Sequence, residues 1–303
     1  MRALVTGSSG FLGRHFVRRL SEEGWLVTGV DTQAVNNAMD ARDVFRRWSG
    51  PWDLVIHCAA VVNGRRTIEH TPMDQVIDFE LDAALFRWAA EVGVGKLVYF
   101  SSSAAYPVWL QSEKMMPYKL DEGDINLDDP QLPDALYGWT KLTGEMIART
   151  AQRAGQDLLI VRPFSGYGSD QDDCYPFPAI MRRAHDWHDP FVVWGSGNQV
   201  RDFVHVDDIV GAVIAFLKAR ITGPINIGTG IATSMSTLAT MAAAACGYTP
   251  TVKPQSNEPE GVFYRVADIS LMSEYYQPKV SLEEGIQRAL RSLSKKERQW
   301  LQW

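Results

Sequence analysis

A tyrosine and a lysine four residues apart form the most chemically suggestive spacing in the sequence. Tyr137 and Lys141 lie in a stretch with helical character, and positions i and i+4 of a helix share one face. An ammonium beside a phenol stabilises the phenolate, and an oxidised nicotinamide would stabilise it further, so the pair can act as a base on an alcohol. Taken alone, such a pair is more often two solvated side chains. The rest of the sequence must therefore supply the context.

Three serines could complete this site. Ser101-Ser102-Ser103 follows the apolar run 96–100, which predicts a buried strand. In a doubly wound parallel sheet, ligands bind at the carboxyl ends of the strands. A hydroxyl there could hold a substrate oxygen and pass its proton to Tyr137. A polar turn leaving the strand would suit three serines equally well.

Three glycines near the N-terminus predict the element that would bind a dinucleotide. A short apolar run leads into Gly7, Gly10 and Gly13, spaced as G-x-x-G-x-x-G. Gly7 can adopt the positive φ of a tight turn, Gly10 lets the backbone approach a pyrophosphate, and Gly13 lets helix and sheet pack closely. The free N–H groups at the start of the following helix would face the anion.

An acidic residue ends the next predicted strand. Helical periodicity follows Gly10, a second strand is predicted over 25–30, and Asp31 comes 18 residues after Gly13. A carboxylate there accepts hydrogen bonds from a ribose 2′-OH and repels a 2′-phosphate, which predicts NAD rather than NADP. The alternative is an ordinary strand-to-helix turn with a surface aspartate.

Strands and helices continue to alternate through the first half of the chain. We predict further strands over 53–60, 96–100 and 158–163, and helices over 76–92 and 137–154. This alternation predicts an α/β protein with a Rossmann-type doubly wound parallel sheet and crossover helices.

The pattern loosens after residue 164, where glycines, prolines and aromatic residues become frequent. We therefore expect two units. An NAD-binding Rossmann domain would span 1–164 and about 200–230, and a smaller C-terminal substrate-binding α/β lobe would span 165–199 and 231–303.

Composition excludes several classes of partner. Thirty Lys and Arg against 36 Asp and Glu give a net charge of −6, which argues against a general nucleic-acid or anionic-membrane surface. No apolar run reaches the roughly 20 residues of a membrane span, and no signal peptide is visible. Cys58, Cys174 and Cys246 lack disulfide or metal spacing, so we expect reduced thiols, no metal and a cytoplasmic protein.

In the order of its motifs, nearly the whole chain resembles an extended short-chain dehydrogenase/reductase, the nucleotide-sugar epimerase/dehydratase family. The matching motifs are Thr6 to Gly13, Asp31, Asp40-Ala41-Arg42-Asp43, His57-Cys58-Ala59-Ala60, Ser101 to Tyr106, Tyr137-x-x-x-Lys141, Arg162-Pro163-Phe164, Arg201 to Asp208, and Arg265-Val266-Ala267-Asp268.

The resemblance implies a role for each matching residue. Ser102, Tyr137 and Lys141 would be catalytic, with Ser103 as the nearby alternative to Ser102. Residues contacting NAD would be Gly7, Ser9, Gly10, Phe11, Leu12, Gly13, Asp31, Asp40, Ala41, Cys58, Ala59, Ala60, Tyr137, Lys141 and Pro163. Residues contacting a UDP- or GDP-linked sugar would be Ser103, Ser165, Arg201 and Arg265, the arginines on its diphosphate. A homodimer formed by the helices around 83–90 and 137–154 is also implied.

Departures from the family pattern narrow the expected reaction. Dehydratases carry an Asp-Glu pair directly after the catalytic hydroxyl, whereas this chain has Ser103-Ala104, which argues against dehydration by that route. Relatives acting on GDP-sugars place a cysteine where Ala104 stands, so 3,5-epimerisation lacks that catalyst. Ser165 replaces a usual Asn, and Glu80 is placed at a helix position where many relatives have a cofactor-contacting Asn.

Chemistry at C4 remains, and we expect an NAD-dependent nucleotide-sugar epimerase that works through a transient 4-keto sugar. Two alternatives stay open. A 4-keto-sugar reductase would need an exchangeable NADH or NADPH, of which Asp31 disfavours NADPH. A non-catalytic dinucleotide sensor would keep the fold without turnover.

Overall fold

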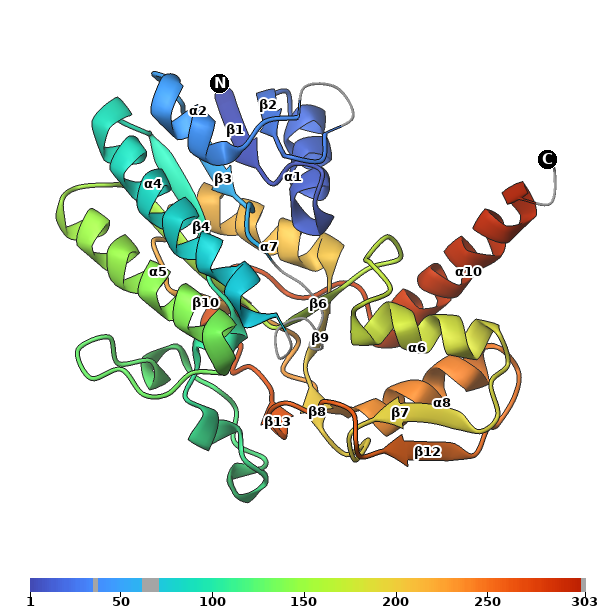
Figure 1. Cartoon of the computed structure of the whole chain (residues 1–303). Coiled ribbons are helices and arrows are strands. Elements are labelled where there is room, and N and C mark those ends of the chain that lie inside the picture. Colours follow the sequence, from blue (N-terminus) through green and yellow to red (C-terminus); the bar gives the residue numbers. More distant parts are fainter. Residues whose placement is uncertain (35–37, 62–70, 301–303) are drawn as a thin grey trace.

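Six parallel strands form the central sheet of the computed structural model, which describes residues 1–34, 38–61 and 71–300. The strand order is β10-β5-β4-β3-β1-β2 (Figure 1). Their bounds are β1 (Arg2–Thr6), β2 (Leu26–Val30), β3 (Leu54–His57), β4 (Lys96–Phe100), β5 (Leu158–Pro163) and β10 (Ile225–Ile227). The predicted Rossmann-type α/β fold is confirmed. The order reverses between β1 and β3, which is where ligands bind in doubly wound sheets.

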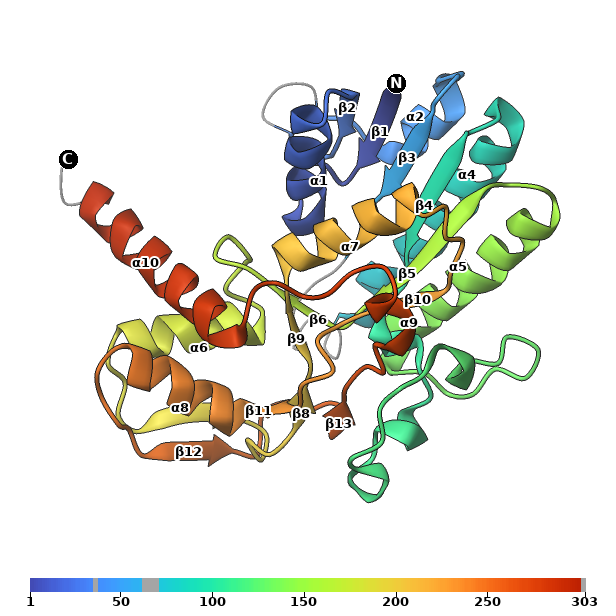
Figure 2. The same cartoon turned by 180° about the vertical axis from the view of Figure 1, so that it is seen from behind.

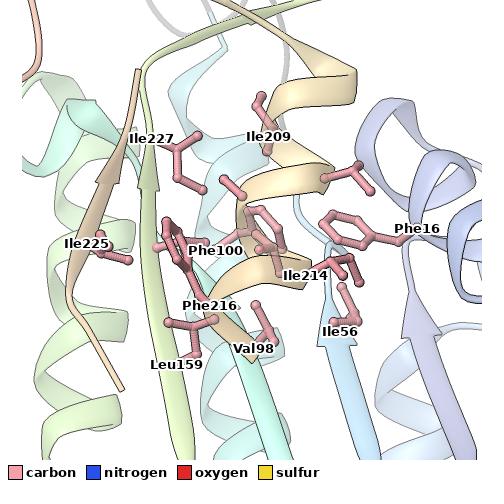
Figure 3. Close-up of a cluster of buried hydrophobic side chains, with 14 of the residues drawn as sticks. Phe16, Ile56, Val98, Phe100, Leu159, Ile209, Ile214, Phe216, Ile225 and Ile227 are labelled. Carbon is pink, nitrogen blue, oxygen red and sulfur yellow. The ribbon is translucent and has the colours of Figure 1, made fainter. Parts of the chain in front are cut away.

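Helices cover both faces of this sheet. On one face lie α1 (Phe11–Glu22) and α7 (Val206–Lys218). Figure 3 shows Phe16 of α1 and Phe216 of α7 packed over the strands, against Val98 of β4 among others. The opposite face carries α2 (Ala41–Arg47), α4 (Ile77–Val92) and α5 (Ala135–Arg153).

The second part of the molecule packs around its own hydrophobic cluster. Strand β7 (Phe191–Trp194) pairs in parallel with β12 (Val252–Gln255), and the helices α6 (Pro176–His185) and α8 (Met235–Ala245) lie beside this pair. Helix α10 (Leu282–Trp300) packs against α6 and α8 (Figure 2). The domain boundaries given above stay a prediction.

Short elements connect the two parts. The strands among them are β6 (Ser165–Tyr167), β8 (Val200–Arg201), β9 (Phe203–His205), β11 (Thr233–Ser234) and β13 (Tyr264–Arg265). The short helices are η1 (Pro72–Val76), η2 (Ser103–Ala105), η3 (Val108–Gln111), η4 (Glu113–Met115), η5 (Glu122–Asp124) and α9 (Ser270–Ser273). Among the described helices, none combines the length and the apolar character required to cross a bilayer.

A buried ion pair fixes α5 against the sheet. Arg162 of β5 donates from Nε and Nη2 to the two carboxylate oxygens of Glu145, over 2.8 and 2.7 Å. Ser101 at the end of β4 donates to the same carboxylate, and Tyr106 and a backbone carbonyl complete the guanidinium's partners. Because both charged groups are 1% exposed, α5 and the residues on it are held in one position.

Candidate active site

The glycine cradle has the geometry that its sequence predicts. Gly7 has φ +67°, the left-handed region that favours glycine. A Cβ on Gly13 would lie 2.0 Å from the carbonyl oxygen of Gly7, so only glycine lets α1 approach the turn this closely. Gly10 precedes α1, and among the described residues no side chain caps this helix. The free N–H groups suit a pyrophosphate, with Ser9, Phe11 and Leu12 around them.

Asp31 is positioned beside this cradle. Its Oδ2 accepts a hydrogen bond of 2.9 Å from the backbone N–H of Ser9, and its Oδ1 accepts one of 2.8 Å from Gln33. The carboxylate at the end of β2 is therefore held next to the helix that would face the pyrophosphate, which fits the adenosine ribose of a dinucleotide.

Replacing Asp31 by asparagine should shift the cofactor preference. The asparagine oxygen can still accept from the Ser9 N–H, but the negative charge that repels a 2′-phosphate is gone. We expect the affinity for NADP to rise at least about tenfold relative to NAD, a difference of roughly 1.4 kcal/mol. Calorimetric titration with both dinucleotides measures this ratio, and an unchanged ratio would contradict the assignment.

Asp40, in the second acidic motif, is bound by the side chain of Arg42. Asp40 caps α2, and the Arg42 side chain donates to both of its carboxylate oxygens. The hydrogen bond from Arg42 holds the pKa of Asp40 below its ordinary value. Arg42 also binds Glu80 over 2.6 Å, so Glu80 points away toward solvent. Asp78, two residues earlier on α4, is 1% exposed, whereas the Glu80 side chain is 64% exposed.

The remaining predicted cofactor residues lie at strand ends. Cys58, Ala59 and Ala60 follow β3, and a Cβ on Gly7 would meet the backbone of Cys58 and Ala59 at 2.7 Å. Burial raises the pKa of the Cys58 thiol, so it remains neutral. Pro163 is the last residue of β5, and Ala41 is buried in the first turn of α2.

Tyr137 and Lys141 share one face of α5, as their spacing predicts. The Lys141 Nζ lies 5.8 Å from the centre of the Tyr137 ring and 5.6 Å from that of Tyr99 on β4. Lys141 is 4% exposed, whereas Tyr137 faces a cavity. Ser102 lines the same cavity, and its hydroxyl accepts from the backbone N–H of Ala104.

One cavity of about 400 Å³ brings most of the predicted substrate residues together. It lies between the sheet and the second part of the molecule. The predicted residues lining it are Ser102, Ser103, Tyr137, Ser165, Arg201 and Arg265. Residues that the sequence analysis did not assign are Asp134, Gln171, Asp173, Cys174, Tyr175, Arg183, Trp194 and Gln199.

Three arginines line this cavity, in different environments. Arg265 is bound by Asp134 over 2.7 Å and by Gln111, so part of its charge is already balanced. Arg201 donates to the backbone oxygens of Val200 and Glu260. The third, Arg183, belongs to no motif that could be recognised in the sequence, and burial lowers its pKa. The cavity thus offers guanidinium groups to an anion such as a diphosphate.

Two carboxamides lie in the wall of the cavity. Gln199 donates from Nε2 to the backbone oxygen of Trp194, and Gln171 donates to that of Gly166. The Oε1 of each is buried and has no hydrogen-bond partner among the described residues. Within the described ranges, no group of three or more His, Cys, Asp or Glu side chains could hold a metal ion.

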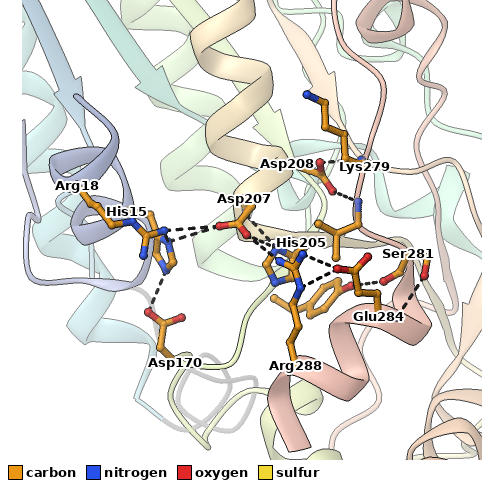
Figure 4. A network of polar contacts seen from close by, with 12 residues as sticks. His15, Arg18, Asp170, His205, Asp207, Asp208, Lys279, Ser281, Glu284 and Arg288 are labelled. Atoms are coloured by element: carbon orange, nitrogen blue, oxygen red, sulfur yellow. Dashed lines mark hydrogen bonds and ion pairs between the residues drawn. The ribbon is translucent and has the colours of Figure 1, made fainter. Parts of the chain in front are cut away.

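A cluster of polar side chains joins α1, the helix that follows the glycine cradle, to the loop 168–175 in the wall of the cavity (Figure 4). His15 and Arg14 of α1 donate to the Oδ2 of Asp170, over 2.9 and 2.7 Å. Asp170 precedes the cavity residues 171–175. Arg18 donates to the Nδ1 of His15, which leaves the Nε2 proton for Asp170. Although burial alone would raise it, the bonds from His15 and Arg14 lower the pKa of Asp170 to about 2.

Asp170→Ala should weaken substrate binding more than turnover. Losing this carboxylate frees the loop 168–175, so we expect KM for the sugar nucleotide to rise about three- to tenfold with little change in kcat. Because the folded-state pKa is lowered, the stabilisation is complete above pH 4 and is lost as the pH falls toward about 2. Asp186→Ala, which removes an exposed partner of His185, is the control. Equal KM values in both variants would show that the contact of Asp170 with α1 does not hold the loop 168–175.

The fold, the glycine cradle and a Tyr/Lys pair beside a ligand cavity define a dinucleotide-dependent enzyme of the short-chain dehydrogenase/reductase class. A family model described as the NAD dependent epimerase/dehydratase family matches residues 3–228. The chain belongs to this family, and its cofactor is NAD.

Characterised relatives span several reactions. The chain is 28% identical over 299 residues to GDP-L-fucose synthase 1 of Arabidopsis thaliana, covering 94% of this chain and 90% of that one. It is 29% identical over 298 residues to a Streptomyces dTDP-4-dehydro-6-deoxy-D-allose reductase, covering 89% of each. The solved UDP-glucose 4-epimerase of Thermotoga maritima, bound to UDP-glucose, superposes with a TM-score of 0.80 at 26% identity over 98% of this chain and 100% of that one.

Proposed function

We propose that the protein is an NAD-dependent nucleotide-sugar 4-epimerase working through a transient 4-keto sugar. The observation that carries the proposal is the single cavity lined by Ser102 and Tyr137 together with Arg201 and Arg265. A diphosphate held by the arginines would leave the attached sugar within the same enclosed space as the two hydroxyls. The fit of NAD rests on the glycine cradle and on Asp31.

The chain's own residues would handle the proton of the sugar 4-OH. Tyr137, as phenolate, accepts that proton while Ser102 holds the oxygen, and Lys141 stabilises the phenolate charge. Bound NAD supplies the hydride acceptor at C4. Arg201 and Arg265 keep the diphosphate while the keto sugar turns over in the cavity. Once the hydride has returned to the opposite face of C4, Tyr137 would give its proton back to O4, so that neither proton nor hydride is lost overall.

Nuclear magnetic resonance of the protein with separate UDP-, GDP- and dTDP-sugars tests this proposal. We expect a new anomeric signal from one of them and no steady accumulation of NADH. The absence of a new anomeric signal with every sugar, or NADH that accumulates with substrate, would refute epimerisation.

A 4-keto-sugar reductase is the second candidate, favoured by the likeness to the Streptomyces reductase. Such an enzyme would oxidise NADH when given a 4-keto nucleotide sugar, and it would leave 4-hydroxy sugars unchanged. Incubation with NADH and a 4-keto nucleotide sugar, followed by the absorbance of NADH, therefore separates the two candidates.

We also propose that the protein is a homodimer. Trp139 and Met146 are 37% and 40% exposed, and they lie seven residues apart on α5, so they share the outer face of this helix. An apolar stripe of this kind suits a helix from a second copy. Light scattering of the purified protein would measure its mass directly.

A further inference from the structure

Buried polar side chains behind the catalytic pair form a connected chain that begins at the glycine cradle. The Thr6 hydroxyl lies 2.8 Å from the Nδ1 of His57. The Nε2 of His57 lies 3.5 Å from the Oδ1 of Asp82, and the Tyr99 hydroxyl donates to the Oδ2 of Asp82 over 2.5 Å. The Lys141 Nζ lies 5.6 Å from the centre of the Tyr99 ring.

The two contacts of Asp82 in this chain differ in kind. Asp82 accepts a hydrogen bond from Tyr99 on its Oδ2, and its Oδ1 faces the Nε2 of His57, which has no hydrogen-bond partner among the described residues. At the other end of the chain, the Thr6 oxygen also accepts from the backbone N–H of Ala59 over 3.3 Å.

A second carboxylate lies one turn earlier on α4. Asp78 is 1% exposed, and its Oδ1 accepts a hydrogen bond of 2.7 Å from the backbone N–H of Val61. Its Oδ2 is buried and has no hydrogen-bond partner among the described residues. Asp78 and Asp82 are spaced i and i+4, so they share one face of α4. This face packs on α5, because a Cβ on Gly144 of that helix would lie 2.7 Å from the Oδ2 of Asp82.

Lys141 is a buried cation that needs such partners. Burial alone would lower its pKa, yet the charges of Tyr137, Asp82 and Asp78 raise the pKa above the ordinary lysine value. Glu145, one turn further along α5, is occupied by Arg162. The titratable groups around Lys141 are Tyr137 and Glu145 of α5, Tyr99 of β4, Asp78 and Asp82 of α4, and His57 and Cys58 of β3 and its following turn.

We propose that Asp82, together with Asp78, is a positioning residue that serves as the counter-charge of Lys141 and so sets the pH range in which the Tyr137/Lys141 pair works. The proposal rests on the catalytic role proposed for that pair. Neither carboxylate lines the cavity, so both would act through Lys141.

Direct titration of Tyr137 tests the proposal without any sugar. The ultraviolet absorbance of the NAD-loaded protein minus that of its Tyr137→Phe variant isolates the phenolate signal of Tyr137. Asp82→Asn removes a negative charge near the pair, so the ionisation midpoint should move to lower pH by about one unit. Asp78→Asn, which keeps the acceptor for Val61, should move the midpoint in the same direction by less.

Two further variants separate charge from structure. Asp82→Glu keeps the charge and should restore the parent midpoint. Asp208→Asn is the matched control, because Asp208 is also buried and also accepts from a tyrosine, Tyr276, but lies on α7. Its midpoint should equal the parent's.

A midpoint that is unchanged or raised in the two Asn variants overturns the proposal. If Asp82→Asn does not fold, Asp78→Asn decides the question alone. Because the titration involves no sugar, a failed epimerase assay leaves its outcome untouched.

Discussion

Tyr137→Phe should lower the rate of sugar conversion by about 10²- to 10⁴-fold, because the phenol is the only proton acceptor that the proposed mechanism uses. The fold and the binding of NAD should persist, since the ring stays and only the hydroxyl facing the cavity is removed. Resonance assays of sugar conversion, together with calorimetric titration of NAD, measure both effects.

Tyr118→Phe is the matched control for this substitution. Tyr118 also carries a hydroxyl that bonds an acid, Asp124 over 2.7 Å, but it does not line the cavity. Removal of the Tyr118 hydroxyl should leave the rate of sugar conversion within about twofold of that of the parent protein. A Tyr137→Phe protein that keeps the parent rate would point instead to the non-catalytic dinucleotide sensor.

Glu145→Ala should cost about 3–5 kcal/mol in the free energy of unfolding, because it leaves the Arg162 guanidinium buried without its counter-ion. The same change removes the acceptor of Ser101 and the partner that fixes α5 on β5. Urea unfolding followed by circular dichroism measures the loss.

Asp128→Ala is the matched control, because Asp128 lies in the loop before α5 and pairs with a residue of that helix. Asp128 binds Arg149 of α5 over 2.8 Å, but its side chain is 76% exposed. Water screens such a pair, so its removal should cost no more than about 1 kcal/mol. Equal losses in both variants would show that the buried pair contributes no more than the exposed one.

The elements of the central sheet were largely predictable. The bounds of β4 and β5 agree with the predicted strands over 96–100 and 158–163. These strands are covered on both faces, so their sequences are continuous apolar runs. The spacing of the glycines indicates the turn between β1 and α1. Helix α5 begins at Ala135, two residues before the predicted start.

The connecting strands were not predictable. Strands β8, β11 and β13 have two residues each, too few for a period of alternation, and they exist because distant segments meet there. The same holds for the cavity residues Arg183 and Gln171, which belong to no recognisable motif and approach the site only through tertiary packing.

The ion pairs of the site residues could not be predicted from the sequence either. Motif matching assigns Asp40 to the cofactor and Arg265 to the diphosphate as though each side chain were free. In the structure, Arg42 binds Asp40 and Asp134 binds Arg265. Partners separated by 131 residues, as Asp134 and Arg265 are, leave no periodic signal.

Asp170 couples the dinucleotide-binding part of the site to the sugar-binding part. One carboxylate is bound by the helix that cradles the dinucleotide and precedes the loop that walls the sugar cavity. If loading the dinucleotide tightens this contact and so improves sugar affinity by some factor, reciprocity requires the sugar to improve dinucleotide retention by the same factor. An enzyme that recycles its hydride carrier in place would benefit, since the carrier would be held hardest while the sugar is half converted.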